Sequence, residues 1–109
     1  MRSVEFHPAA AAELAAAAQF YEAQAENLGL DFLSAVQRAA QQIMEYPDSG
    51  GPFGLHLRRV LVPRFPYGLV YRVEPERLYV VVVMHLHRQP GYWRSRLRQG
   101  AEEPPSPES

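Results

Sequence analysis

The sequence predicts an α+β fold in which an antiparallel helical hairpin packs on one face of a small, mainly antiparallel sheet. Two long segments rich in strong helix formers lie between residues 9 and 46, and three strand-like segments follow between residues 57 and 86. A short alternation of polar and apolar residues precedes the helices. Because the helices and most of the strands occur in separate runs, we expect a layer of helices packed on a layer of strands. The expected order of elements is βααβββα, with a short final helix.

The N-terminal half is expected to form one strand and two helices. Ser3–Phe6 alternates in polarity like a short strand, and the proline of His7-Pro8 suits the first turn of a helix over Ala9–Glu26. Asn27-Leu28-Gly29 is typical of a helix end, and a second helix is expected over Leu30–Tyr46. Because the connection is so short, the two helices must form an antiparallel hairpin.

Each predicted helix carries one apolar stripe. Side chains three or four residues apart lie on the same side of a helix, so a stripe marks the side that faces the core. The stripe of the first helix consists of Leu14, Ala17 or Ala18, Tyr21, Ala25 and Leu28. The stripe of the second helix consists of Phe32, Val36, Ala39 or Ala40, and Ile43.

Three strands are expected after a loop over Pro47–Leu55, which is rich in proline and glycine. The strand-like segments are Leu57–Val62, Tyr67–Glu74 and Arg77–Leu86. From residue 78 onward the last of them is apolar on both faces apart from one histidine, which indicates a central strand. The sheet face away from the helices is expected to stay open unless the C-terminal segment or a partner covers it.

The chain is expected to be one domain over residues 1–98, with a short helix near Tyr92–Arg98 at its end. Residues 99–109 are rich in proline, serine and glutamate, and we expect this acidic tail to be disordered because it has little apolar surface to bury. There is no apolar run long enough for a membrane span, no export signal and no cysteine, so a cytoplasmic bacterial protein is the simplest interpretation.

The charges are divided unevenly along the chain. Residues 1–54 contain two arginines and seven acidic residues, whereas residues 55–98 contain nine arginines and two acidic residues. Every basic residue of the chain apart from histidine is an arginine, the side chain best suited to bidentate contacts with phosphate or carboxylate. The second half therefore predicts a cationic surface for an anionic partner.

Arginines around the second predicted turn form the first candidate site. Arg58 and Arg59 are neighbours in a strand and point to opposite faces, so at most one of them faces the helices. Arg64 follows in the turn. Together with Arg72 and Arg88, these arginines are predicted to contact a target or a partner. The alternative is an ordinary solvated edge, since arginine is mostly a surface residue.

His85 and His87 form the second candidate site. They lie two residues apart near the end of the last strand, on the face where strict alternation would also place Val81 and Val83. Histidine can give or take a proton near neutral pH, whereas the alternative for His85 is a buried structural role. Two histidines without a cysteine or a nearby aspartate are too few ligands to predict a metal site, and no cofactor is predicted.

The third candidate site is a mixture of aromatic residues and arginine near the C-terminus. Tyr92, Trp93, Arg94 and Arg96 can stack on bases and bind phosphates, as such mixtures do in nucleic-acid-binding proteins. The alternative is that Tyr92 and Trp93 fill the edge of the core.

The chain resembles the RelE/ParE superfamily, the toxins of bacterial type II toxin–antitoxin modules that are often described as plasmid stabilisation proteins. The resemblance rests on the helical hairpin and on motifs that follow it in order. These motifs are Arg58-Arg59, Arg64-Phe65-Pro66-Tyr67, Val70-Tyr71-Arg72-Val73 and His85-Leu86-His87-Arg88-Gln89-Pro90-Gly91-Tyr92-Trp93.

The resemblance implies one of two activities. RelE-like members cut messenger RNA in the ribosome by attack of a ribose 2′-hydroxyl on the adjacent phosphate, which needs a base, an acid and cations. In that case Arg64 would hold the phosphate, His85 or His87 would transfer protons, and Tyr92 would occupy an aromatic position. ParE-like members inhibit DNA gyrase and are not known as hydrolases.

The sequence departs from the best nucleases of the superfamily, because it has no lysine and no acidic residue between Leu55 and Tyr71. We therefore expect a toxin that blocks growth by inhibiting an essential process such as gyrase function. The alternatives are a ribosome-dependent mRNA endonuclease and a non-toxic family member that acts as an interaction protein. For a toxin, the resemblance also implies a cognate acidic antitoxin, which we expect on the helical hairpin and the open sheet face.

Overall fold

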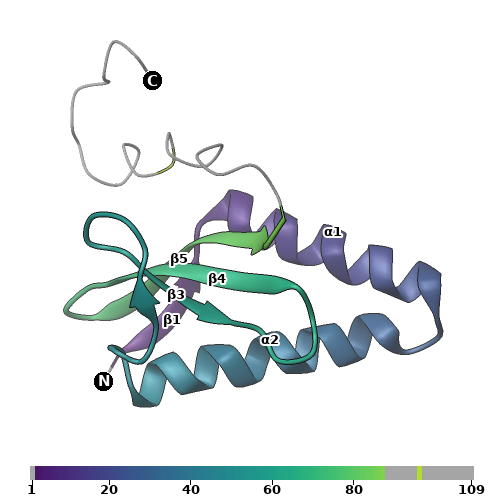
Figure 1. The fold of residues 1–109 in the computed structure, drawn as a ribbon, viewed down its shortest axis with the longest axis horizontal. Helices are drawn as coiled ribbons and strands as arrows, with labels where there is room; N and C mark the ends of the chain where they lie inside the picture. The colour runs from purple at the N-terminus through teal and green to yellow at the C-terminus, as the bar shows by residue number, and fades with distance from the viewer. Residues whose placement is uncertain (1, 88–95, 97–109) are drawn as a thin grey trace, which may run out of the picture.

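Two helices pack against a five-stranded sheet in the computed structural model, which describes residues 2–87 and residue 96 (Figure 1). This confirms the predicted α+β class and the order of the strand, the helical hairpin and the later strands. The elements are β1 (Ser3–Phe6), α1 (Pro8–Gln24), α2 (Leu28–Glu45), β2 (Gly51–Pro52), β3 (Arg58–Leu61), β4 (Tyr67–Val73) and β5 (Arg77–His85). The predicted C-terminal helix lies almost wholly outside the described residues.

The start of α1 is fixed by His7 and Pro8. The ring of His7 is buried, and its Nδ1 accepts a hydrogen bond of 3.0 Å from the backbone N–H of Ala9. The backbone N–H of His7 donates to the carbonyl of Val80 in β5 at 2.9 Å. One residue therefore caps the helix and ties it to the sheet, with the proline in the first turn as the sequence predicted.

The turn between the helices is held by Glu22 near the end of α1. Its carboxylate accepts hydrogen bonds of 2.9 Å from the backbone N–H groups of Asn27 and Gly29. A side chain on Gly29 would place its Cβ 2.5 Å from the carbonyl oxygen of Ala18, so only glycine allows the helices to approach this closely. This turn lets α2 begin at Leu28, two residues before the predicted start.

The core lies between the helical hairpin and one face of the sheet. The predicted stripe of α2 is confirmed, since Phe32, Val36, Ala39 and Ile43 are all buried. In α1 the prediction is correct for Ala17 but wrong for Ala25, which is exposed because the helix ends at Gln24. The sheet contributes buried side chains of β3, β4 and β5 to the same cluster, namely Val60, Leu69, Tyr71, Leu78, Val80 and Val83.

The strands are arranged in the order β1-β5-β4-β3-β2, with β1 parallel to β5 and the other pairs antiparallel. Strand β5 is therefore interior, as its apolar sequence predicted. Its pairing with β1 ends where Phe6 lies opposite Val80, so the remainder of β5 extends beyond β1. Gly51 and Pro52 pair with Arg59 and Arg58 of β3 and therefore form the short strand β2. This strand lies inside the segment that was predicted as a loop.

A β-bulge in the β4–β5 pair changes which face the residues of β5 point to. Val70 pairs with Val82 and Tyr71 with Val80, so Val81 is an extra residue. Val83 consequently belongs to the helix-facing core, whereas Val81 joins the apolar cluster on the other face. The prediction that Val81 and Val83 share a face is wrong, because it assumed strict alternation through this position.

The sheet face away from the helices was expected to stay open unless the C-terminal segment or a partner covers it. In the structure this face carries a second buried apolar cluster that consists of Leu57, Val70, Val81, Val82 and Met84. Phe53 and Tyr79 pack against this cluster. Among the described residues, no helix combines the length and the apolar character that crossing a membrane requires.

Candidate functional site

The two predicted histidines lie close together at the end of β5. Their ring centroids are 5.4 Å apart, and the backbone N–H of His87 donates a hydrogen bond of 3.2 Å to Nδ1 of His85. Tyr67, which pairs with His85 across the β4–β5 ladder, places its ring centroid 5.1 Å from that of His85. The end of the sheet thus presents three neighbouring rings whose polar atoms can donate or accept hydrogen bonds.

Beside these rings is a hollow of about 370 Å³ between α1 and β5. It is lined by Glu13, Ala16, Ala17, Phe20, Tyr21, Tyr67, Val83 and His85. Burial, together with the nearby Tyr67, raises the pKa of Tyr21 above its ordinary value of 10.0. The Tyr21 hydroxyl therefore stays protonated at neutral pH and can donate a hydrogen bond there.

Glu13 and Arg96 form the tightest polar cluster beside the hollow. Two nitrogens of Arg96 donate to the two carboxylate oxygens of Glu13 at 3.0 and 2.7 Å, which is a bidentate ion pair. The backbone N–H of Val83 also donates to Glu13, at 3.1 Å, and Arg96 donates to the carbonyl of Val81 at 3.0 Å. Both side chains are largely buried, with 20% and 14% of their surface exposed.

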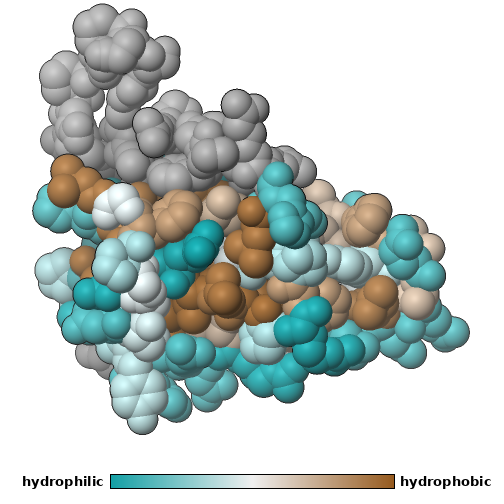
Figure 2. Space-filling model, in the orientation of Figure 1, coloured by the Kyte–Doolittle hydropathy of each residue, from teal (hydrophilic) through white to brown (hydrophobic). Residues whose placement is uncertain are grey.

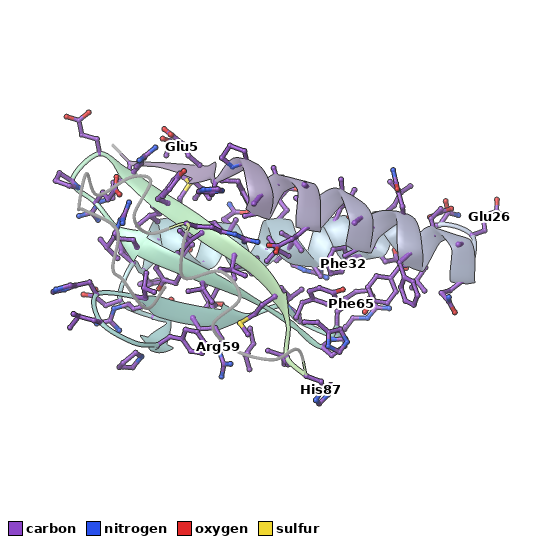
Figure 3. All side chains as sticks on the ribbon, turned by 90° about the horizontal axis from the view of Figure 1, so that it is seen from above. Glu5, Glu26, Phe32, Arg59, Phe65 and His87 are labelled. Atoms are coloured by element: carbon purple, nitrogen blue, oxygen red, sulfur yellow. The ribbon has the colours of Figure 1, made fainter. Side chains whose placement is uncertain are left out.

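Arg64 lies in the turn between β3 and β4, near the same end of the sheet. Its backbone is left-handed, with a φ of 72°, and its exposed guanidinium lies 5.6 Å from the ring centroid of Phe65. The turn is tied to the end of β5 because the N–H of Leu86 donates to the carbonyl of Pro66 at 2.9 Å. In Figure 3, Phe65 and His87 lie toward one end of the sheet and Glu5 toward the other.

Most of the described arginines in the second half make ion pairs within the molecule. Arg58 lies 3.6 Å from Asp48 and donates to the carbonyl of Gly50 at 2.7 Å. Arg72 pairs with Glu74 at 2.7 Å, and Arg77 pairs with both Glu74 and Glu5. The acidic first half and the basic second half therefore partly neutralise each other.

Arg59 and Arg64 differ from these arginines, because neither has a carboxylate partner among the described residues. The guanidinium of Arg59 lies 4.9 Å from the ring centroid of Phe53, on the sheet face away from the helices. Its side chain crosses Gly68, where a Cβ would come within 3.1 Å of it. One of the two neighbouring arginines thus lies on the face away from the helices, as predicted, and it is Arg59.

Four predicted site residues, Arg88, Tyr92, Trp93 and Arg94, lie outside the described residues. Glu13, Tyr21 and Tyr67 were not among the predicted site residues. Glu13 is one acidic residue in an alanine-rich helix, and its partners follow 70 and 83 residues later. No local pattern connects residues so far apart. Tyr67 was visible only as part of the Arg64-Phe65-Pro66-Tyr67 motif.

Comparison with known proteins identifies the class to which this fold and site belong. The sequence profile described as "ParE toxin of type II toxin-antitoxin system, parDE" matches residues 4–90. The chain therefore belongs to the ParE toxin family. No curated protein sequence matches it.

A solved structure has the same fold. It is titled "Chromosomal ParDE TA system from P. aeruginosa", and its similarity covers 80% of this chain and 98% of that chain with a TM-score of 0.71. The two sequences are 18% identical, so this likeness bears on the fold alone.

Proposed function

We propose that this protein is a toxin that a cognate antitoxin neutralises and that blocks growth by inhibiting an essential process such as DNA gyrase function. The match to the ParE toxin family over residues 4–90 supports a ParE-like rather than a RelE-like activity. The protein would act in the cytoplasm, where both its target and its antitoxin are made.

The state of Glu13 is the structural observation that most favours binding over catalysis. Glu13 is the carboxylate that lines the hollow beside His85. It accepts three hydrogen bonds, two from Arg96 and one from Val83, so its charge is already stabilised within the protein. Both oxygens of this carboxylate are therefore occupied by partners within the protein, so it is poorly placed to contact a reacting substrate.

A ribosome-dependent mRNA endonuclease is the second candidate, and the contact of His85 with His87 and Tyr67 favours it. In this case Arg64 would bind the phosphate, and one of the two histidines would exchange protons with the reacting ribose. Tyr92, also predicted for this site, lies outside the described residues.

The surface for the antitoxin is proposed on the helical hairpin and the adjoining sheet. The hairpin exposes four large apolar side chains, namely Phe20, Leu30, Leu33 and Met44. Figure 2 shows apolar surface in the middle of one face of the molecule, above a hydrophilic lower rim where α2 runs. Apolar side chains of the antitoxin would cover such surface, and its acidic side chains would pair with Arg59 and Arg64.

A growth assay tests the proposal. Expression of the toxin should arrest growth, and co-expression of the product of the adjoining gene should restore it. The double variant Arg64→Ala/His85→Ala should still arrest growth if the toxin acts by binding gyrase through a wider surface. Loss of arrest in a folded double variant, together with cleaved messenger RNA in cells that express the wild type, would favour the nuclease. Harmless expression of the wild type would favour a non-toxic interaction protein.

A further inference from the structure

Arg59 is a cation that the fold holds in place without neutralising it (Figure 3). Its side chain lies across Gly68 of β4, where an added Cβ would come within 3.1 Å of it, and its guanidinium lies 4.9 Å from the ring centroid of Phe53. Within residues 2–87 and residue 96, no carboxylate pairs with Arg59. The two contacts therefore direct the guanidinium and leave it able to bind an anion from elsewhere.

The surface beside Arg59 is open on the side of β2. Gly51 pairs with Arg59 across the β2–β3 ladder, so a side chain at position 51 would project from the same face of the sheet. A Cβ built on Gly51 meets no atom within 4 Å. An anionic group can therefore approach the guanidinium of Arg59 from this direction without moving any described side chain.

The chain itself contains an anionic segment that suits this site. Residues 99–109, the acidic tail, contain three glutamates and no basic residue, and two of the glutamates are adjacent at Glu102 and Glu103. The family match ends at residue 90, so the acidic tail lies outside the part of the chain that matches the ParE toxin family. Its negative charge complements the guanidinium of Arg59.

The acidic tail is long enough to reach Arg59. Arg96 donates to the carbonyl of Val81 in β5 at 3.0 Å. Beside this contact a row of paired residues crosses the sheet, from β5 through Val70 of β4 to Arg59 of β3. Two strand spacings add up to about 10 Å. The stretch from Arg96 to Glu102 spans up to about 20 Å when it is extended, so its length permits the contact.

We propose that Glu102 and Glu103 of the acidic tail bind Arg59 in the free protein and shield its charge from anionic partners. Because the tail and Arg59 belong to one chain, the contact is intramolecular and has a high effective concentration. An exposed ion pair is weak, so a partner that places a carboxylate more firmly against Arg59 displaces the tail. The contact thus makes the tail a built-in competitor for the site at Arg59.

Carbodiimide cross-linking of the full-length protein tests the contact directly. The chain contains no lysine, so Arg59→Lys introduces a single lysine and keeps the positive charge. A carbodiimide joins an amine to a carboxylate that touches it, and mass spectrometry identifies the joined peptides. We expect a cross-link from position 59 to Glu102 or Glu103. A folded variant without this cross-link would overturn the proposal and leave the proposed function intact.

Arg38→Lys is the matched control for the cross-link. Arg38 is exposed on α2, which packs on the opposite face of the sheet from the Arg59 guanidinium, and its replacement also gives a chain with a single lysine. Its cross-link to the tail should be at least about fivefold weaker, because the effective concentration of the tail is lower there. Equal cross-linking from positions 38 and 59 would contradict a defined site.

Removal of the tail charges tests the shielding, and this step rests on the proposed function. The probe is the purified product of the adjoining gene, and calorimetry measures its dissociation constant for the toxin. Glu102→Gln/Glu103→Gln should tighten binding about twofold to fivefold, the range for one exposed ion pair. With Arg59→Ala also present, the same double substitution should change nothing, because the tail has lost its site.

The remaining outcomes separate the contact from other effects of the tail. Unchanged binding by Glu102→Gln/Glu103→Gln would overturn the shielding. Equal tightening with and without Arg59 would show a general repulsion between the tail and the partner, which contradicts the proposed contact. No binding of the adjoining gene's product by the wild type would count against the proposed function, whereas the cross-link would still decide whether the tail binds Arg59.

Discussion

Arg64 combines an uncommon backbone conformation with an exposed charge. A left-handed φ costs a residue other than glycine about 1 kcal/mol or more. The arginine side chain offsets little of this cost, since among the described residues it contacts the Phe65 ring but has no carboxylate partner. Strain that local packing does not explain tends to occur at functional positions. We therefore infer that Arg64 serves binding rather than folding.

Replacing Arg64 separates these two roles. Arg64→Gly should be more stable than Arg64→Ala by about 0.5–1 kcal/mol, because glycine adopts a positive φ without strain. Urea denaturation measures the difference. Arg59→Gly is the control, since Arg59 lies in β3 with ordinary strand geometry, and there glycine should cost about 1 kcal/mol relative to alanine. Equal stability of the two Arg64 variants would contradict the strain argument.

Tyr71 is a buried residue whose hydroxyl holds the loop after α2. The hydroxyl donates to the carbonyl of Pro47 at 2.7 Å and accepts from the N–H of Gly50 at 3.0 Å. Tyr71→Phe should therefore lower the free energy of unfolding by about 1–3 kcal/mol, because both loop groups lose their partner. Tyr46→Phe, at a residue that is 65% exposed, should have almost no effect.

The pH dependence of stability tests the burial of the Tyr71 hydroxyl. Burial raises the pKa of Tyr71 above its ordinary value of 10.0. The unfolded chain therefore loses this proton at a lower pH than the native protein does. The contribution is fully present below about pH 10 and is lost as pH rises through the native pKa. Tyr71→Phe should lack this alkaline loss. If the wild type and Tyr71→Phe lost stability equally as pH rises above about 10, Tyr71 would not be the source of that loss.

The turn between β4 and β5 is stabilised by a cluster around Glu74. Its carboxylate accepts from Arg72 at 2.7 Å and from Arg77 at 2.6 Å, while Arg77 also reaches Glu5 of β1. Burial would raise the pKa of Glu74, but the hydrogen bonds from Arg77 and Arg72 outweigh burial and lower it below 4.5. The guanidinium of Arg77 thus joins the β4–β5 hairpin to the parallel strand β1.

This cluster predicts how the sheet responds to acid. Because the native pKa of Glu74 is lowered, its contribution is present above about pH 4.5 and is lost as pH falls through the native pKa. Glu74→Gln should lower stability at pH 7 by about 1.5 kcal/mol and flatten this acid dependence. Glu76→Gln removes an exposed charge in the same turn and should do neither. Equal acid profiles for the two variants would exclude the proposed role.

The spacing of apolar residues along the sequence predicted the helices and the main strands well. The side of a helix or strand that is buried follows from residues only a few positions apart. The stripe of α2 and the central position of β5 are examples. The bulge at Val81 was not predictable, since four consecutive valines fit either face equally well. The ion pair between Glu13 and Arg96 was not predictable, because the two residues are 83 positions apart in the sequence.

For the whole molecule, the uneven distribution of charge along the sequence is partly balanced within the fold. Three ion pairs join the acidic first half to the basic second half, namely Glu5–Arg77, Asp48–Arg58 and Glu13–Arg96. The sequence alone counted all of these arginines as available to an anionic partner. The structure leaves Arg59 and Arg64 as the arginines of residues 55–87 without a carboxylate partner. Within residues 55–87, the cationic surface is therefore smaller than the sequence alone implied.

A supercoiling assay with the purified toxin tests gyrase inhibition most directly. Gyrase, relaxed plasmid and ATP are incubated with increasing amounts of wild-type toxin, with and without the product of the adjoining gene. If the protein inhibits gyrase, the toxin alone should block supercoiling and the second protein should restore it. Undisturbed supercoiling at toxin concentrations that cleave messenger RNA in a ribosome-programmed translation reaction would contradict it.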